Sequence, residues 1–271
     1  MRVPFIKMQG LGNDFVVLDA REYDIPLLTD DVARHLADRR LGIGCDQVIR
    51  LDPSGDDKAD ARMRIWNADG SEAGACGNAS RAIALLIGQP ASVLTEGGLI
   101  AVTPGDGVAS VDMGAPRFDW QDVPLAYAMD TLSMPVGWED LENPGAVNVG
   151  NPHVVFAVED CDAIPLDRLG PTIETDPLFP ERVNVNVATV ESRTRIRLRV
   201  WERGAGLTKA CGTGACATAV ALMRRGLVDS AVTVALPGGD LDISWQDGGP
   251  IIMTGSAAES FRGSFEWDDY S

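Results

Sequence analysis

Two segments of the chain that lie 135 residues apart have similar sequences. When residues 62–88 are aligned with residues 197–223, eight of the 27 positions carry the same residue, where ordinary composition would give roughly two. The repeat includes Ala75-Cys76-Gly77, which lies over Ala210-Cys211-Gly212. Because solenoid repeats recur every 20–50 residues or so, this longer period indicates two copies of a whole domain. Each copy then places one cysteine at the same structural point.

The repeat continues upstream with a slightly different offset. Gly12-Asn13-Asp14-Phe15 matches Gly150-Asn151-Pro152-His153, and residues 46–49 match residues 183–186. A single asparagine in such a place is commonly a turn residue, but the same ordered set in both halves predicts a shared site. The first set is Asn13, Gln47, Asn67 and Cys76, and the second is Asn151, Asn184, Glu202 and Cys211.

Length and charge limit the class of protein. A chain of 271 residues suits two domains, each large enough to bury a core. It contains no apolar run long enough to span a bilayer, and its start lacks the apolar segment of a secretory signal. We therefore expect a soluble cytoplasmic protein that does not bind a membrane. A net charge of −17 argues against a nucleic-acid partner, whose phosphates need a basic surface.

The composition also argues against a metal or a cofactor. The five cysteines include no Cys-x-x-Cys pair, and only His35 and His153 could supply imidazole ligands, so no zinc site is expected. None of the three lysines, Lys7, Lys58 and Lys209, lies in an evident cofactor-binding loop, which disfavours pyridoxal phosphate chemistry. Cofactor-free thiol chemistry is what remains.

Short β-branched runs separated by turn residues predict a sheet-rich architecture. Helices are predicted over residues 29–39, 78–87 and 213–224. The last two are rich in alanine and strongly apolar, so we expect each to run through the middle of its own domain.

Each repeated cysteine follows a strand and a polar loop and opens a helix. Unpaired N–H groups at a helix start bind anions and lower a thiol pKa from about 8.5 to roughly 3.5–7.5. Each loop is therefore predicted to hold a carboxylate and to favour a thiolate. A lone cysteine in this place is more often an inert packing residue, and we interpret the unduplicated Cys45, Cys161 and Cys216 in that way.

Two equivalent thiols suit the inversion of a carbon that bears an acidic hydrogen. One thiolate removes the proton while the other thiol supplies a proton to the opposite face, and the roles exchange in the reverse direction. The two titrations are then coupled. A nearby carboxylate site stabilises the negative charge that develops.

The motifs closely resemble those of the diaminopimelate epimerase family. The matching blocks follow the family's order over nearly the whole chain, at residues 8–15, 42–47, 67–72, 76–78, 150–153, 202–204 and 210–216. The resemblance implies cofactor-free interconversion of LL- and meso-diaminopimelate in lysine biosynthesis, with Cys76 and Cys211 as the acid/base pair. It implies that His153 and Glu202 influence the thiol pKa values. The implied substrate contacts are Asn13, Gln47, Asn67, Gly77, Asn78, Asn151, Asn184, Glu202, Arg203, Gly212 and Thr213.

The resemblance also implies a fold and an assembly. The fold is α+β, with two pseudo-symmetric domains, each a curved, barrel-like mixed β-sheet around a central helix. We expect the N-terminal domain over residues 1–116, the C-terminal domain over residues 117–262, and a return of residues 263–271 to the first domain. The family also suggests a homodimer.

Three residues depart from the family pattern. Ala79 replaces a usual glycine, Ala82 a usual cysteine outside the catalytic pair, and Leu207 a usual glutamate in the loop before Cys211. None is a proposed catalytic residue, so they affect expectations of rate or loop closure rather than of activity.

Two other functions stay open from the residues. One is a two-cysteine racemase of another amino acid, such as proline or hydroxyproline, and the other is a duplicated protein that binds an amino acid without chemistry. Arg203 and the matched carboxamides disfavour the first, because a proline-like substrate has no distal amino-acid end.

Overall fold

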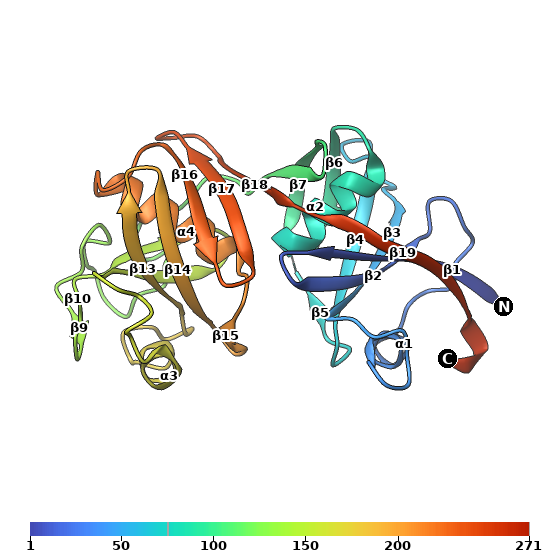
Figure 1. The fold of residues 1–271 in the computed structure, drawn as a ribbon, viewed down its shortest axis with the longest axis horizontal. Helices are drawn as coiled ribbons and strands as arrows, with labels where there is room; N and C mark the ends of the chain where they lie inside the picture. The colour runs from blue at the N-terminus through green and yellow to red at the C-terminus, as the bar shows by residue number, and fades with distance from the viewer. Residues whose placement is uncertain (75, 271) are drawn as a thin grey trace. The chain divides into compact units, whose positions relative to one another are not determined.

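The computed structural model describes residues 1–74 and 76–270 and divides into two compact units (Figure 1). Unit 1 comprises Met1–Asp112 with Thr254–Ser271, and unit 2 comprises Met113–Met253. The sequence predicts these two domain boundaries after residues 116 and 262. Ala75 of the repeated motif and Ser271 of the predicted returning segment lie outside the described residues.

Unit 1 is built mostly of strands with two helices. Its elements are β1 (Arg2–Gly10), β2 (Asn13–Asp19), α1 (Asp30–Ala37), β3 (Gln47–Pro53), β4 (Ala61–Asn67), β5 (Glu72–Ala73), α2 (Gly77–Ile87), β6 (Ala91–Thr95), β7 (Gly98–Pro104), β8 (Val108–Asp112), β19 (Ala258–Glu266) and the 3-10 turn η1 (Trp267–Asp269). The C-terminal strand β19 pairs antiparallel with β1, from Arg2 opposite Glu266 to Gln9 opposite Ala258. In Figure 1 this red strand lies beside the blue first strand.

Unit 2 repeats the same kinds of element. Its elements are β9 (Gly137–Trp138), β10 (Leu141–Glu142), β11 (Gly145–Asn148), β12 (Pro152–Ala157), α3 (Leu166–Glu174), β13 (Asn184–Ser192), β14 (Arg195–Glu202), β15 (Gly206–Thr208), α4 (Gly212–Arg224), β16 (Ala231–Leu236) and β17 (Gly239–Trp245). The strand β18 (Ile251–Ser256) carries the chain from unit 2 into unit 1.

The strand pairings of the two units correspond residue by residue. In unit 1, β2 runs parallel to β3, β3 antiparallel to β4, and β4 parallel to β6. In unit 2, β12, β13, β14 and β16 pair in the same senses. Phe15 lies opposite Gln47 in the first unit, and His153, its partner in the repeat, lies opposite Asn184 in the second. The repeat in the sequence is therefore a repeat of sheet register.

Each unit encloses one helix that begins at a repeated cysteine. Asn78–Ala84 of α2 are all buried, and so are Gly214–Leu222 of α4. Both helices are rich in alanine, and these small side chains let the surrounding strands approach closely; α4 contacts β11, β12, β13, β14, β16 and β17. The predicted fold class, α+β with a mixed sheet around a central helix in each domain, is confirmed.

The shorter helices show where the sequence patterns succeed and fail. The helix predicted over residues 29–39 is α1, where the Thr29 hydroxyl accepts from the Val32 N–H and caps the first turn. Helix α3 was not predicted. It contains Pro171 directly after Gly170, a pair that normally marks a loop, and it forms because packing of Leu166, Leu169 and Ile173 in the core of unit 2 outweighs that local preference.

Candidate active site

The polar set of unit 1 lies at one edge of its sheet. Asn13 begins β2, Gln47 begins β3, and Asn67 ends β4, which runs in the opposite direction. Gln47 and Asn67 are paired directly across the two strands. Cys76 is the N-cap of α2, and the Asn13 amide donates to its sulfur over 3.9 Å. The structure therefore brings these four predicted site residues together.

The amides of unit 1 leave two oxygen atoms for a ligand. Gln47 Nε2 donates to Asn67 Oδ1 over 3.0 Å, and Asn67 Nδ2 donates to the Ser71 hydroxyl. Within residues 1–74 and 76–270, the buried Asn13 Oδ1 and Gln47 Oε1 have no hydrogen-bond partner. Buried acceptors are normally satisfied, so an unpaired pair of them suits an incoming donor such as an ammonium group.

The first turn of α2 holds its asparagine firmly. Gly77 and Asn78 open this helix, and Asn78 is buried. Its Oδ1 accepts from Nη2 of Arg81 over 2.8 Å, and the Arg81 side chain is fully buried. Arg81 was not among the predicted site residues, although an arginine four residues after a helix-opening glycine in an otherwise apolar helix is a usable signal. Ala79 and Ala82, which differ from the family pattern, are both fully buried in α2.

The corresponding set of unit 2 lies at the equivalent edge. Asn151 directly precedes β12, Asn184 begins β13, Glu202 ends β14 and Cys211 is the N-cap of α4. Asn184 is nearly fully buried; its Nδ2 donates to the Pro152 carbonyl over 2.8 Å, and its Oδ1 accepts from the N–H of Arg203 over 2.9 Å. These four residues are therefore also together, and Asn184 ties two of the strand ends to each other.

Two charged residues, Glu202 and Arg203, lie at this edge of unit 2. The partly buried Glu202 accepts from the Thr208 hydroxyl over 2.5 Å. Arg203 is exposed, and its Nη1 donates to the Glu181 carbonyl over 2.9 Å. Among the described residues no carboxylate pairs with Arg203, so its charge is available to an anionic ligand. The departing residue Leu207 is 44% exposed on β15.

Cys211 has polar contacts that favour its thiolate and an enclosure that opposes it. The Gly214 N–H donates to its sulfur over 3.3 Å, and the Thr213 hydroxyl lies 3.6 Å from the same atom. Both contacts favour a thiolate, as the helix start predicts. Burial nevertheless raises the pKa of Cys211 well above the ordinary thiol range, and the negative charge of Glu202 raises it further. The expected thiolate preference is therefore wrong for Cys211, because the prediction took no account of complete enclosure.

His153 is a neutral side chain in the interior of unit 2. It is fully buried, its Nε2 lies 2.8 Å from Asn151 Oδ1, and its Nδ1 lies 3.0 Å from Nδ2 of Asn186. Burial lowers the pKa of His153 to about 3, and the positive charge of Arg203 acts in the same direction. Asn186 was not among the predicted site residues, and its only signal in the sequence is a polar side chain among the valines of residues 183–187.

The buried imidazole predicts a loss of stability in mild acid. The pKa of His153 is about 3 in the fold and about 6.5 in the unfolded chain, so between these values only the unfolded chain gains the proton. The stabilisation is therefore complete above pH 6.5 and is lost as the pH falls towards 3. Between pH 7 and pH 5 we expect a loss of about 2 kcal/mol from this group. Urea unfolding at both pH values measures it, and His153→Phe should reduce the difference between them by that amount; an unchanged difference would contradict the assignment.

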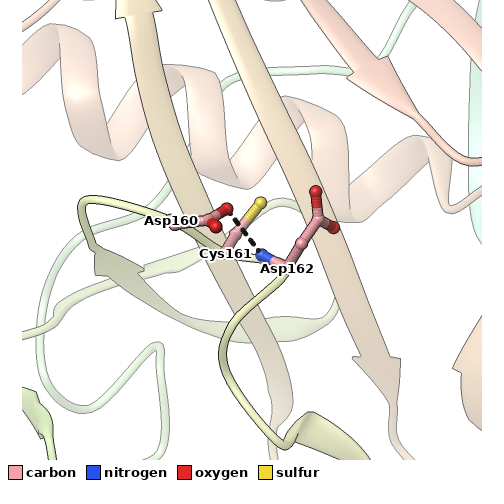
Figure 2. A group of neighbouring side chains, drawn as sticks. All are labelled: Asp160, Cys161 and Asp162. Atoms are coloured by element: carbon pink, nitrogen blue, oxygen red, sulfur yellow. Dashed lines mark hydrogen bonds between the residues drawn. The ribbon is translucent and has the colours of Figure 1, made fainter.

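The remaining cysteines have the surroundings of packing residues. Cys45, Cys161 and Cys216 are at most 1% exposed, and burial raises the pKa of Cys45 to about 11. Figure 2 shows Cys161 between Asp160 and Asp162. Nη1 of Arg197 contacts Asp160 Oδ1 at 3.1 Å and also pairs with Asp162. Because the guanidinium of Arg197 pairs with both carboxylates and also with Glu191, the group is explained as a surface ion-pair network.

The comparisons with known proteins agree with the motifs. The profile of the diaminopimelate epimerase family matches residues 5–118 and 145–259, which is most of both units. The chain belongs to the diaminopimelate epimerase family. A diaminopimelate epimerase from Erythrobacter litoralis is 66% identical over the full length of both chains. Another from Rhizorhabdus wittichii is 63% identical over 96% of this chain and 94% of that one.

A solved structure shows the same fold at low sequence identity. A phenazine biosynthesis protein of the PhzF family from Bacillus anthracis superposes with a TM-score of 0.69 at 15% identity, over 98% of this chain and 99% of that one. This likeness concerns the fold alone. Among the helices of the described residues, none combines the length and apolar character that crossing a bilayer requires.

Proposed function

We propose that this cofactor-independent epimerase interconverts LL- and meso-2,6-diaminopimelate by proton transfer at the α-carbon, with Cys76 and Cys211 as acid and base. One observation carries the proposal: each unit presents a cysteine at the start of an enclosed helix, beside a matched set of polar side chains in the same sheet register. The names of relatives up to 66% identical supply the substrate.

The chemistry needs one proton shared between two sulfurs. A thiolate at one cysteine takes the α-proton, and the electron pair of the broken C–H bond stays on the α-carbon. The thiol of the other cysteine then delivers its proton to the opposite face, which leaves the second sulfur ionised. Because enclosure keeps Cys211 protonated, we propose that Cys211 begins as the acid and Cys76 as the base.

The polar sets suit the ends of a diamino-diacid. N–H groups of the first turn of a helix have no partner within the helix, so Gly77, Asn78, Gly212 and Thr213 can supply donors for the carboxylate at the reacting carbon. Arg203 can hold the distal carboxylate through paired N–H groups. The unpaired oxygens of Asn13 and Gln47 can accept from an ammonium group.

Two alternative functions explain fewer features of the structure. A two-cysteine racemase of proline would gain nothing from the unpaired charge of Arg203, because proline has no distal carboxylate. A non-catalytic binding protein would have no use for two cysteines in equivalent places. Both readings account for fewer of the described contacts.

The deciding experiment follows hydrogen exchange in deuterated water. LL-diaminopimelate incubated with the protein should gain deuterium at the α-carbon and yield the meso isomer, whereas free proline should gain none. The reaction should proceed without added pyridoxal phosphate or metal and in the presence of a chelator. Binding of diaminopimelate without deuterium uptake would favour the binding protein, and exchange into proline would favour the racemase.

We also propose a homodimer in the cytoplasm. The family resemblance supports the dimer, and unit 1 exposes apolar side chains that an interface could cover, namely Tyr23, Leu27, Leu41 and Phe261. Light scattering during gel filtration should give twice the 28.9 kDa of one chain. A mass of one chain at micromolar concentration would refute the dimer.

A further inference from the structure

A continuous line of polar contacts joins a buried asparagine to the sulfur of Cys211. Asn186 lies in β13 with no exposed surface, and its Nδ2 is 3.0 Å from Nδ1 of His153. The His153 Nε2 is 2.8 Å from Asn151 Oδ1, and Asn151 Nδ2 is 3.4 Å from the Thr213 hydroxyl. That hydroxyl is 3.6 Å from the sulfur. All five residues belong to unit 2.

The donor and acceptor of each hydrogen bond in this line follow from the contacts of Asn186, the residue at its buried end. The Asn186 Nδ2 also donates to the Val154 carbonyl over 3.0 Å, and a carbonyl can only accept, so the amide nitrogen must be the atom that faces His153. His153 Nδ1 is then an acceptor, which puts the ring proton on Nε2, where it is donated to Asn151 Oδ1. Asn151 consequently turns its NH₂ group to Thr213, and the Thr213 hydroxyl donates to Cys211 whenever that sulfur is ionised.

The first turn of α4 is built around this asparagine. A Cβ on Gly214 would lie 2.9 Å from Asn186 Oδ1 and 3.2 Å from the sulfur of Cys211. Within the described residues, Asn186 Oδ1 has no hydrogen-bond partner. Leaving a buried carbonyl oxygen unsatisfied costs stability, so the amide is a poor choice for packing alone.

The other copy of the domain shows that the fold needs no polar pair here. The repeat places Phe15 where unit 2 has His153 and Ile49 where it has Asn186, in the same strand register, and both apolar side chains are fully buried. The same sheet is thus completed by hydrophobic packing in unit 1. The polar pair of unit 2 therefore serves the cysteine at the end of the line rather than the architecture.

We infer that Asn186 is a positioning residue for the reaction: it holds His153 as the Nε2–H tautomer and, through Asn151, directs the Thr213 hydroxyl at the sulfur of Cys211. The low pKa of His153 keeps this tautomer uncharged at neutral pH. The nearby charged groups are Glu202, which acts on Cys211, and Arg203, which acts on His153. The part that concerns catalysis rests on the proposed function, and the tautomer does not.

The first test reads the tautomer directly. The chain has only two histidines, so a ¹⁵N-histidine-labelled sample gives two imidazole spectra, and His35→Gln identifies which belongs to His153. At pH 7 without substrate, His153 should carry its proton on Nε2. In Asn186→Ile, which installs the residue found at the matching place in unit 1, the Nδ1-protonated form should appear. A wild-type proton on Nδ1, or an unchanged spectrum in the variant, would overturn the inference.

The second test separates positioning from stability. Asn186→Ile should lower kcat by roughly 10-fold or more, because misplacing an active-site group slows the reaction by up to about 100-fold, with KM changed less than about twofold. The double variant His153→Phe with Asn186→Ile copies the apolar pair of unit 1, so it should melt near the wild-type temperature and still be slow. Ile49→Val, the matched control in unit 1, should lower the melting temperature and keep its kcat.

The outcomes of the kinetic test are distinct. A double variant that is both stable and fully active would overturn the positioning role, and so would a loss of kcat in Ile49→Val as large as that in Asn186→Ile. A wild-type protein that shows the expected tautomer but exchanges no α-proton would contradict the proposed function and leave the tautomer assignment standing.

Discussion

Cys211→Ala should lower the rate of conversion of LL- to meso-diaminopimelate by about 10³-fold. The variant still has a thiol at position 76, but it cannot deliver or remove a proton on the second face of the α-carbon. Alanine removes the contact between the Cys211 sulfur and the Gly214 N–H that caps α4, so a thermal melt of the variant should accompany the rate measurement. The measurement is deuterium uptake by mass spectrometry together with conversion of the LL to the meso isomer. Cys76→Ala is expected to lose inversion to a similar extent.

Cys216→Ala is the matched control for this prediction. Cys216 lies in the same helix and is also fully buried, but sequence and structure both make it a packing residue. Its replacement should lower stability by about 1 kcal/mol, as loss of a small buried group does, and keep the rate within about twofold. If Cys211→Ala or Cys76→Ala retained full activity, the two-base scheme would be wrong.

Arg203→Gln should raise KM for diaminopimelate by about 100-fold. Hydrogen bonds between charged groups contribute roughly 1.5–3 kcal/mol each, and glutamine offers neither the charge nor the forked pair of donors. The effect should fall mainly on binding, because the distal carboxylate is remote from the reacting carbon. Steady-state kinetics on LL-diaminopimelate, with the meso isomer followed by chiral chromatography, measures KM and kcat separately.

Arg182→Gln provides the comparison for Arg203. Arg182 is exposed and pairs with the buried Glu174 at 3.6 Å, so its loss removes one positive charge from unit 2 without removing a proposed ligand. This control should leave KM within about twofold of the wild-type value. If the two variants raised KM equally, general charge rather than a specific contact would explain the effect, and the assignment of Arg203 would be wrong.

The placement of the matched polar residues at the sheet edges could be predicted because the duplication constrains their positions twice. Gln47 and Asn184 are unremarkable polar residues when each is considered alone. In both copies the matched amide residue is followed by an acceptor side chain and then by a cysteine. This shared order identified the strand ends that form one edge of each sheet. The helices after the cysteines were also predictable, because alanine-rich apolar segments without proline favour a helix regardless of what surrounds them.

Other features depend on contacts that no local pattern contains. Helix α3 forms in spite of Pro171 because its apolar face is buried in the core of unit 2. Asn186 resembles one more residue of a β-strand until its amide is seen to contact His153 and Val154. The arginine at position 81 is a signal in the sequence, but its partner Asn78 is seen only in the structure.

By itself, the sequence determined the family, the two-domain organisation of the fold and the residues at the two sheet edges, since these are properties of residue type and spacing that both copies share. Only the tertiary structure decided the direction in which the pKa of Cys211 is shifted. The N–H groups at a helix start favour a thiolate in every such loop, but the pKa of Cys211 is raised because side chains distant in sequence exclude water from it and Glu202 lies beside it. Desolvation depends on complete enclosure in three dimensions, and spacing along the chain does not encode it.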